Sequence, residues 1–263
     1  MRPSPTDSSS GDFDERFERH AKSLAEGRPS YPAQLYQQIL AAAGCRTFEV
    51  AVDVGCGAGH SLSGLFAIAN EVRGVEPGVR LRELAERLHP EAIVSAGTGE
   101  ETGLAAESID LVAIGTAFTW MDSKRTLSEA HRVLRRGGIL AIYAYGFPRL
   151  RGSADEVVRR HLREHWDAHR SSLLRDPIDV GACARESGLF RSCDSFVVPN
   201  WIDYEPARLA RFFASASFVN AFMETQEDPQ SYLAQLEREL RVAAGDRLEV
   251  DFSLATTVAQ KSE

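Results

Sequence analysis

The sequence predicts an α/β protein with a doubly wound, mostly parallel seven-stranded sheet and helical cap insertions. Short apolar runs rich in β-branched residues alternate with stretches of helical spacing, which is typical of βαβ units. Several of these runs end in an acidic residue or in closely spaced glycines, as strands do where they turn into helices. Two long connections of helical spacing fall late in the chain. The expected strands are residues 51–54, 71–76, 92–95, 108–115, 139–143, 195–198 and 248–255.

The first expected strand leads into the most informative segment of the chain. Asp53 lies near its end, and glycines follow at alternate positions. These are Gly55, Gly57 and Gly59. Such a turn lets a ligand approach the backbone closely. It is not the dinucleotide pattern G-x-G-x-x-G, because the position of the third glycine holds His60 in one frame and Leu62 in the other.

The next two strands also end in features suited to a nucleoside. Glu76 and Pro77 close the second strand, and Glu76 follows Gly59 by 17 residues (76 − 59). A carboxylate at this point of a βαβ unit can accept both ribose hydroxyls of a nucleoside held over the glycine turn. Gly99 and Glu100 follow the third strand. We expect that loop to meet the polar edge of the base.

The fourth strand ends at a turn that contains Thr116, Ala117, Phe118 and Trp120. Residues 127–136 have helical spacing, and the glycine pair at 137–138 predicts the end of that helix before the fifth strand. The carboxyl ends of parallel strands lie at one edge of a sheet, so all these turns are expected to border one pocket.

Five motifs in the order expected for one nucleoside pocket carry a family resemblance. They are R-P-x-Y-P from Arg28, D-x-G-x-G-x-G from Asp53, G-T-x-E from Gly97, F-x-W-x-D from Phe118 and R-V-L-R-x-G-G from Arg132. Residues 17–145 thereby resemble the class I S-adenosylmethionine (SAM)-dependent methyltransferases. Within that class they resemble the small-molecule branch that includes trans-aconitate methyltransferase-like enzymes. The resemblance implies a Rossmann-like fold, SAM as cofactor and methyl transfer to a small organic acceptor.

The resemblance also assigns roles to residues of this chain. It implies that the cofactor binds Asp53, Gly55, Cys56, Gly57, Gly59, Glu76, Pro77, Gly99, Glu100, Thr116, Ala117 and Phe118. Candidates for catalysis are Tyr31, Trp120, His20, His161 and His165. The rings of Tyr31 and Trp120 can stabilise a sulfonium by cation–π contact and exclude water. A carboxylate acceptor needs no base, whereas a phenol, alcohol or carbon acid needs one such as Tyr31 or one of the histidines.

Other functions stay open as alternatives. The chain has Thr119 where the family often has a histidine, and a member that binds SAM without donating its methyl group is one alternative. An NAD(P)-linked oxidoreductase is disfavoured because the dinucleotide pattern is absent. A nucleic-acid methyltransferase is disfavoured because residues 115–118 lack the Asn/Asp-Pro-Pro-aromatic signature. The sequence leaves open whether O, N or C is methylated, and the oligomeric state.

Three histidines, His161, His165 and His169, recur every four residues in the first long connection. On a straight helix the first and third would lie about 12 Å apart along the axis, too far to share one zinc ion. We therefore expect no metal site there. With several arginines around them, a solvated polar face is the simpler expectation, and the alternative is that one histidine faces the pocket and removes a proton from the acceptor.

The expected organisation is one methyltransferase domain, residues 13–263, after a disordered tail, residues 1–12. Within it we expect N-terminal lid helices in 13–46, a SAM-binding core in 47–146 and cap insertions at about 147–190 and 200–245. The insertions should cover the carboxyl edge of the sheet and select the acceptor.

The composition of the chain limits the kinds of binding partner that we expect. The net charge of −8 disfavours nucleic acid, which is bound mainly through clustered Lys and Arg. The four cysteines form no C-x-x-C pair, so reduced thiols in a cytoplasmic protein are expected, and Cys56 should serve as a small side chain rather than a nucleophile. The sequence has no apolar stretch long enough to span a bilayer and no secretion signal, so we expect no membrane partner.

Overall fold

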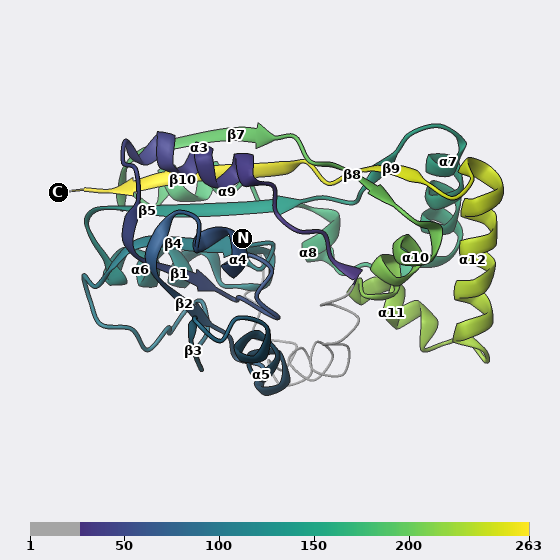
Figure 1. Cartoon of the computed structure of the whole chain (residues 1–263), viewed down its shortest axis with the longest axis horizontal. Helices are drawn as coiled ribbons and strands as arrows, with labels where there is room; N and C mark the ends of the chain where they lie inside the picture. The colour runs from purple at the N-terminus through teal and green to yellow at the C-terminus, as the bar shows by residue number, and fades with distance from the viewer. Residues whose placement is uncertain (1–26, 263) are drawn as a thin grey trace.

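The computed structural model describes residues 27–262 (Figure 1). The predicted tail, residues 1–12, the first part of the predicted lid helices and the candidate His20 lie outside the described residues. The described chain forms a large sheet with its helices and, beyond one end of that sheet, a lobe of helices around a small second sheet.

The large sheet has seven strands in the order β3-β2-β1-β4-β5-β10-β7. The first five run parallel, and β10 is antiparallel to both of its neighbours, β5 and β7. The predicted fold class is therefore confirmed. The strands are β1 (Phe48–Val54), β2 (Ala69–Val75), β3 (Ile93–Ser95), β4 (Ile109–Gly115), β5 (Leu134–Tyr145), β7 (Phe190–Val198) and β10 (Leu254–Lys261).

Parallel strands buried on both faces account for the apolar runs of the sequence. In β4, for example, every residue from Leu111 to Ile114 is at most 1% exposed. The helices that pack around this sheet are α3 (Ala33–Ala43), α4 (Leu62–Leu65), α5 (Val79–Leu88), α6 (Ser123–Val133), α8 (Ser172–Arg175) and α9 (Val180–Glu186).

The prediction of a helix over 127–136 was wrong at both ends. Asp122 caps α6 by accepting a hydrogen bond from the backbone N–H of Arg125 (2.9 Å), so the helix begins at Ser123. It ends at Val133, and β5 starts at the next residue. The glycine pair lies inside β5, where Gly137 has a φ of +73°. It bends the strand rather than ending the helix.

The last predicted strand, 248–255, was also wrong, because it is two strands in two sheets. β9 (Leu248–Asp251) belongs to the small sheet, and β10 begins at Leu254. Asp251 accepts hydrogen bonds from the backbone N–H and hydroxyl of Ser253, which turns the chain between them. Val250, Phe252 and Leu254 are all fully buried, so the alternation of a strand continues through the break and hides it in the sequence.

We call the helical lobe the cap lobe and define it as residues 147–169 and 201–252. Its small antiparallel sheet has the order β6-β9-β8, with β6 (Arg149–Leu150) and β8 (Trp201–Tyr204). Its helices are α7 (Ser153–His161), α10 (Pro206–Ala214), α11 (Ser217–Met223) and α12 (Pro229–Ala244). Trp166, Tyr204, Phe213 and Phe252 are buried at its centre. Helical insertions were expected from the sequence; the small sheet was not.

The expectation that His161, His165 and His169 form a row on one straight helix was wrong. α7 ends at His161, and a π-helical turn (Leu162–Trp166) and a 3-10 turn (Asp167–His169) follow it. The wider turn places Trp166, which is fully buried, in the core of the cap lobe. His161 is only 3% exposed, so it does not lie on a solvated face.

Residues 27–262 contain neither a membrane-spanning helix nor a cluster of metal ligands. None of the helices there is both long enough and apolar enough to cross a membrane. Within the same residues, no cluster of three or more His, Cys, Asp or Glu side chains is arranged to hold a metal ion.

Glu129 on α6 fixes the loop that follows β3. Its Oε1 accepts hydrogen bonds from the backbone N–H (2.9 Å) and the hydroxyl (2.6 Å) of Thr102. Arg132 donates to both carboxylate oxygens (2.7 and 2.8 Å) and to the backbone carbonyl of Leu104 (2.8 Å). The hydrogen bond from Arg132, followed by those from Thr102, lowers the pKa of Glu129 to about 2. One buried carboxylate thereby joins the loop to the helix.

We expect Glu129→Gln to lower the free energy of unfolding at pH 7 by about 1–3 kcal/mol, because an amide cannot replace a carboxylate that accepts four hydrogen bonds. The stabilisation is present above the usual pKa of 4.5 and is lost as the pH falls toward 2. Urea unfolding of variant and wild type should therefore differ less at pH 3 than at pH 7. The exposed Glu83→Gln is the control. A difference that is the same at both pH values would contradict this assignment.

Candidate functional site

The turn after β1 has the shape that its glycines predict. Gly55, Gly57 and Gly59 have φ values of +73°, +56° and +91°, a region that residues with a Cβ rarely adopt. A Cβ on Gly55 would lie 2.7 Å from the Cβ of Ala117, so the turn packs directly against the segment after β4. No heavy atom lies within 4 Å of where a Cβ of Gly57 would be. The turn therefore presents bare backbone to open space.

Glu76 is tied to this turn by hydrogen bonds. Its Oε2 accepts from the backbone N–H of Gly57 and its Oε1 from that of Gly78, each at 2.9 Å. The residue is 7% exposed, and Pro77 beside it lies on the surface. Backbone donors that hold a carboxylate in this way fix its direction. The carboxylate of Glu76 is thereby placed against the glycine turn.

Asp53 lies under the same turn and is almost completely buried, with 2% of its surface exposed. Its Oδ1 is buried and has no hydrogen-bond partner. Burial, and to a lesser extent the negative charge of Glu76, raises the pKa of Asp53 from 3.8 to about 8. A buried carboxyl with an unmatched oxygen is unfavourable unless a cation or donor joins it. The base of the pocket is thus suited to a positively charged ligand.

Cys56 points away from the open side of the turn. Its Sγ lies 2.9 Å from the position that a Cβ of Gly74 in β2 would take. Burial raises the pKa of its thiol well above the usual value. This placement agrees with the expected small packing side chain, because a thiol that stays protonated is a poor nucleophile.

The loop after β3 closes against the turn after β4. The backbone N–H of Asp122 donates to Oε1 of Glu100 (2.7 Å). A Cβ on Gly99 would lie 2.4 Å from the sulfur of Met121, whose side chain also borders Gly55. Sequence reasoning missed Met121, although it directly follows the aromatic turn. Its thioether lies between two of the glycine segments predicted to hold the nucleoside.

Thr116 and Tyr31 meet at the end of β4. Thr116 has a φ of +62°, a strained conformation for a β-branched residue. Its hydroxyl is hydrogen-bonded to the hydroxyl of Tyr31 (2.9 Å). The ring of Tyr31 packs edge-on against Tyr143, with centroids 5.0 Å apart, and a Cβ on Gly115 would lie 2.8 Å from its hydroxyl oxygen. The R-P-x-Y-P segment therefore brings Tyr31 onto the sheet edge beside the predicted cofactor residues.

The two other aromatic candidates lie in the 3-10 turn Phe118–Trp120. Phe118 is 3% exposed and packs into the core with Leu127 and Ala184, so its main contacts are structural. Trp120, at the end of the turn, is partly exposed.

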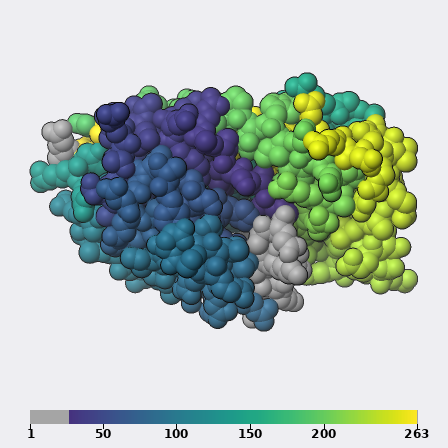
Figure 2. Space-filling model, viewed as in Figure 1, coloured from purple at the N-terminus to yellow at the C-terminus, as the bar shows by residue number. Residues whose placement is uncertain are grey.

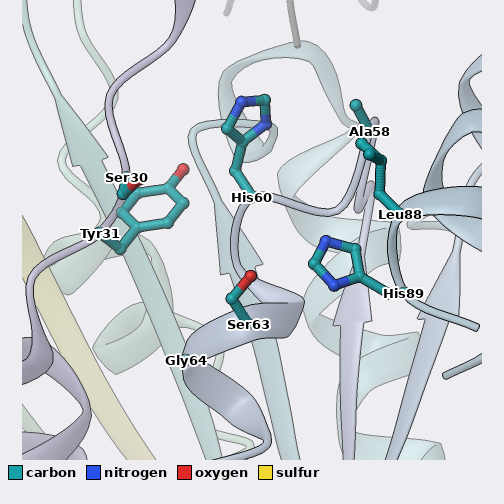
Figure 3. Close-up of a pocket in the computed structure, with 8 residues that line it drawn as sticks. All are labelled: Ser30, Tyr31, Ala58, His60, Ser63, Gly64, Leu88 and His89. Carbon is teal, nitrogen blue, oxygen red and sulfur yellow. The ribbon is translucent and has the colours of Figure 1, made fainter. Parts of the chain in front are cut away.

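A cavity of about 180 Å³ opens beside the glycine turn (Figure 3). Its lining residues come from three segments that are distant in the sequence. They are Ser30, Tyr31, Ala58, His60, Ser63, Gly64, Leu88 and His89. In Figure 3 the polar ends of Tyr31, His60 and Ser63 face a common space. Burial lowers the pKa of His89. His60 and His89 were not among the predicted site residues, although His60 directly follows Gly59.

The histidines of the cap lobe are not part of this cavity. His161 is bonded through both ring nitrogens, Nδ1 to the hydroxyl of Tyr232 (2.7 Å) and Nε2 to Glu239 (2.9 Å). Burial lowers its pKa. His165 stacks on Phe222, with ring centroids 5.3 Å apart. The structure therefore places both histidines in the aromatic interior of the cap lobe, and of the catalytic candidates within residues 27–262 only Tyr31 lines the cavity.

Comparison with known proteins agrees with this geometry. Residues 52–142 match the family model described as a methyltransferase domain. An uncharacterised methyltransferase of Mycobacterium tuberculosis is 34% identical over 116 residues, which cover 44% of this chain and 46% of that relative. Residues 52–142 thus resemble a methyltransferase domain. All the predicted cofactor residues lie inside it, whereas the match covers only about half of the relative's length.

Solved structures extend the likeness beyond residues 52–142. A proposed type II methyltransferase from Anaeromyxobacter dehalogenans is 26% identical with a TM-score of 0.66, and the match covers 89% of this chain and 97% of that one. Phosphoethanolamine N-methyltransferase 2 of Haemonchus contortus was solved with phosphomonomethylethanolamine and S-adenosylhomocysteine. It is 16% identical with a TM-score of 0.53, covering 97% of this chain and 58% of that one, which shows a shared fold.

We expect Asp53→Asn to stabilise the ligand-free protein, and to do so more strongly at pH 9 than at pH 6. The folded protein holds a proton on Asp53 up to about pH 8, and the unfolded chain only up to about 3.8. The stability contributed by that proton is therefore lost as the pH rises through 8, at about 1.4 kcal/mol for each unit of pKa shift. An asparagine does not titrate. Melting temperatures from pH 6 to 9 measure the difference.

Asp194→Asn, at an exposed position of β7, is the matched control for the Asp53 measurement. It should leave the pH profile of the melting temperature unchanged. If Asp53→Asn shifts the melting temperature by the same amount at every pH, the carboxyl is ionised in the folded protein and the assignment fails.

Proposed function

We propose that this protein is a SAM-dependent methyltransferase that acts on a small organic molecule. The observation that carries the proposal is the pairing of two carboxyls at one turn. Glu76 is held by the backbone of the glycine turn, and Asp53 lies beneath that turn with an unmatched oxygen. A nucleoside whose ribose hydroxyls face Glu76 and whose cationic or hydrogen-bond-donating group faces Asp53 suits both carboxyls.

The residues present fit this cofactor. Glu76 would accept the ribose hydroxyls, and Asp53 would face a positively charged group of the ligand. The open space over Gly57 leaves room for the part of SAM that links its ribose to its positively charged group. The loop at Gly99 and Glu100 would border the base. When bound, SAM supplies a methyl group already activated by its sulfonium.

The protein's remaining task is to align the acceptor and to exclude water. We infer that the acceptor enters at the cavity beside Tyr31, because Tyr31 lines it and also contacts Thr116 at the sheet edge. Burial, followed by the proximity of Tyr145, raises the pKa of Tyr31 well above 10. Its hydroxyl therefore stays protonated and donates a hydrogen bond rather than acting as a base.

An acceptor that must lose a proton has a different candidate base in this cavity. The lowered pKa of His89 keeps its imidazole neutral at pH 7, the form that accepts a proton. This assignment replaces the histidines of the cap lobe in our proposal, because His161 already bonds through both ring nitrogens. The relation to trans-aconitate methyltransferase-like enzymes remains part of the proposal.

We expect Glu76→Ala to weaken the binding of S-adenosylhomocysteine by about 1–3 kcal/mol, because the ribose hydroxyls lose a charged acceptor. Isothermal titration calorimetry measures this directly, with the exposed Glu86→Ala as the control. NADH, titrated in parallel, should bind weakly or not at all. Unchanged affinity in Glu76→Ala would remove Glu76 from the site, and tighter binding of NADH would favour an oxidoreductase.

Methyl transfer itself is tested with SAM labelled in its methyl group and a panel of small acids, phenols, alcohols and amines. We expect label to appear in an acceptor extracted from the reaction. Tight binding of SAM without transfer to any member of the panel would favour the alternative of a member that binds the cofactor without donating its methyl group.

A further inference from the structure

The strands β7 and β8 form one continuous outer edge. β7 is the last strand of the large sheet, and β8 is the last strand of the small one. Both pair antiparallel with their neighbour in one unbroken register, since Val198 pairs with Leu254 and Trp201 with Asp251. In Figure 1 β7 runs along the upper border of the large sheet and leads into β8. In Figure 2 green atoms show at that upper border beside the purple helix α3. We call residues 190–204 the β7–β8 edge.

Alternate residues of the β7–β8 edge direct their backbone groups outward. The N–H of Phe252 donates a hydrogen bond to the carbonyl oxygen of Asn200 (2.8 Å), and these two residues are partners in the shared register. Hydrogen-bonded and non-bonded pairs alternate in an antiparallel ladder. The even-numbered residues therefore bond to β9 and β10. The odd-numbered ones face away, where no strand of residues 27–262 pairs with them.

The β7–β8 edge also carries exposed apolar side chains. Val197 is 65% exposed and Trp201 is 44% exposed. Natural edge strands are commonly protected by lysine, proline or a bulge. β7 contains no lysine and no proline, and its irregular pairing lies at its first residue, Phe190. Pro199 lacks an N–H, but its carbonyl can still accept a hydrogen bond. The edge is therefore suited to pairing with another strand.

A second copy of the same edge is a complementary partner when the two run antiparallel around Val197. That register sets Val197 against the partner's Val197, and Trp201 against the partner's Cys193. It also sets Arg191 opposite the partner's Asp203, and the symmetry repeats this pair of opposite charges. The exposed apolar side chains and the charges of the edge are thus matched by the same pairing.

The helix α9 favours the same register. It lies over the odd-numbered face of β7, where the thiol of Cys193 donates to the backbone carbonyl of Gly181 (3.7 Å). The odd-numbered side chains of β8 are exposed on the same face. Two edges centred on Val197 therefore place the α9 of each copy over the uncovered end of the other. A register centred on Asp194 would bring the two α9 helices together and set two carboxylates opposite one another.

We propose that two copies of this chain form a symmetric dimer by antiparallel pairing of their β7–β8 edges around Val197. The pairing continues the large sheet from one copy into the other. It also holds, in each copy, the ribbon that connects the large sheet to the cap lobe. This inference is independent of the proposed function.

Sedimentation velocity of the full-length protein tests the dimer. We expect wild type to be dimeric at about 100 µM. Val197→Lys should weaken the dimer by about tenfold or more, because it sets two like charges against each other on the symmetry axis. The matched control is Val242→Lys, at a valine of α12 that is 90% exposed, and it should dimerise as wild type does.

An exchange of charges tests the register. Arg191→Glu and Asp203→Arg each set like charges opposite one another, so each variant alone should dimerise more weakly. An equimolar mixture of the two should restore the dimer, because every such pair in the mixed dimer joins opposite charges. The pair of Asp203 with Arg247 within one chain is exposed and contributes little. As the control, Asp194→Arg in place of Asp203→Arg should not restore the dimer.

Three outcomes overturn the proposal. The first is a wild type that stays monomeric at that concentration. The second is a dimer that Val197→Lys leaves unchanged, which would place the interface elsewhere. The third is a mixture of Arg191→Glu and Asp203→Arg that remains as weakly dimeric as either variant alone. Circular dichroism checks the fold of each variant, and the charge variants replace Val197→Lys if that variant does not fold.

Discussion

The hydrogen bond between Glu76 and the backbone of Gly57 is the constraint on which the site depends. It joins the end of β2 to the turn after β1, and the second oxygen of Glu76 binds Gly78 at the start of α5. A carboxylate can bridge the two segments only if the turn offers a bare N–H, which the positive φ values of its glycines provide. Because β1 lies between β2 and β4, fixing this turn also sets where the segment after β4 packs.

The sequence predicted this part of the structure well for a physical reason. Each cofactor candidate lies at the carboxyl end of a parallel strand, and a parallel sheet brings such ends to one edge whatever the connections between them are. The contacts of Gly55 with Ala117 and of Glu76 with Gly57 follow from that rule. Bringing these turns together at one edge therefore needed no long-range information.

The remainder of the site depends on contacts that local patterns do not encode. His89 reaches the cavity because α5 ends there, a helix position that no motif marks. The break between β9 and β10 was hidden because buried residues alternate through it, and only the pairing of β9 with β6 and β8 reveals it. The prediction for the histidines of the first insertion was wrong because a π-helical turn changes which residues face inward. The spacing of apolar residues in the sequence does not reveal such a turn.

Asp53 and Arg28 each have one buried polar atom without a hydrogen-bond partner among the described residues. Tyr31 is within electrostatic reach of both, and it lines the cavity. In the free protein each of these two atoms lowers the stability of the fold, since its hydrogen bond to water is lost on folding and not replaced within the described residues. A ligand that matches them relieves both costs at once, so binding and stability are coupled through this segment.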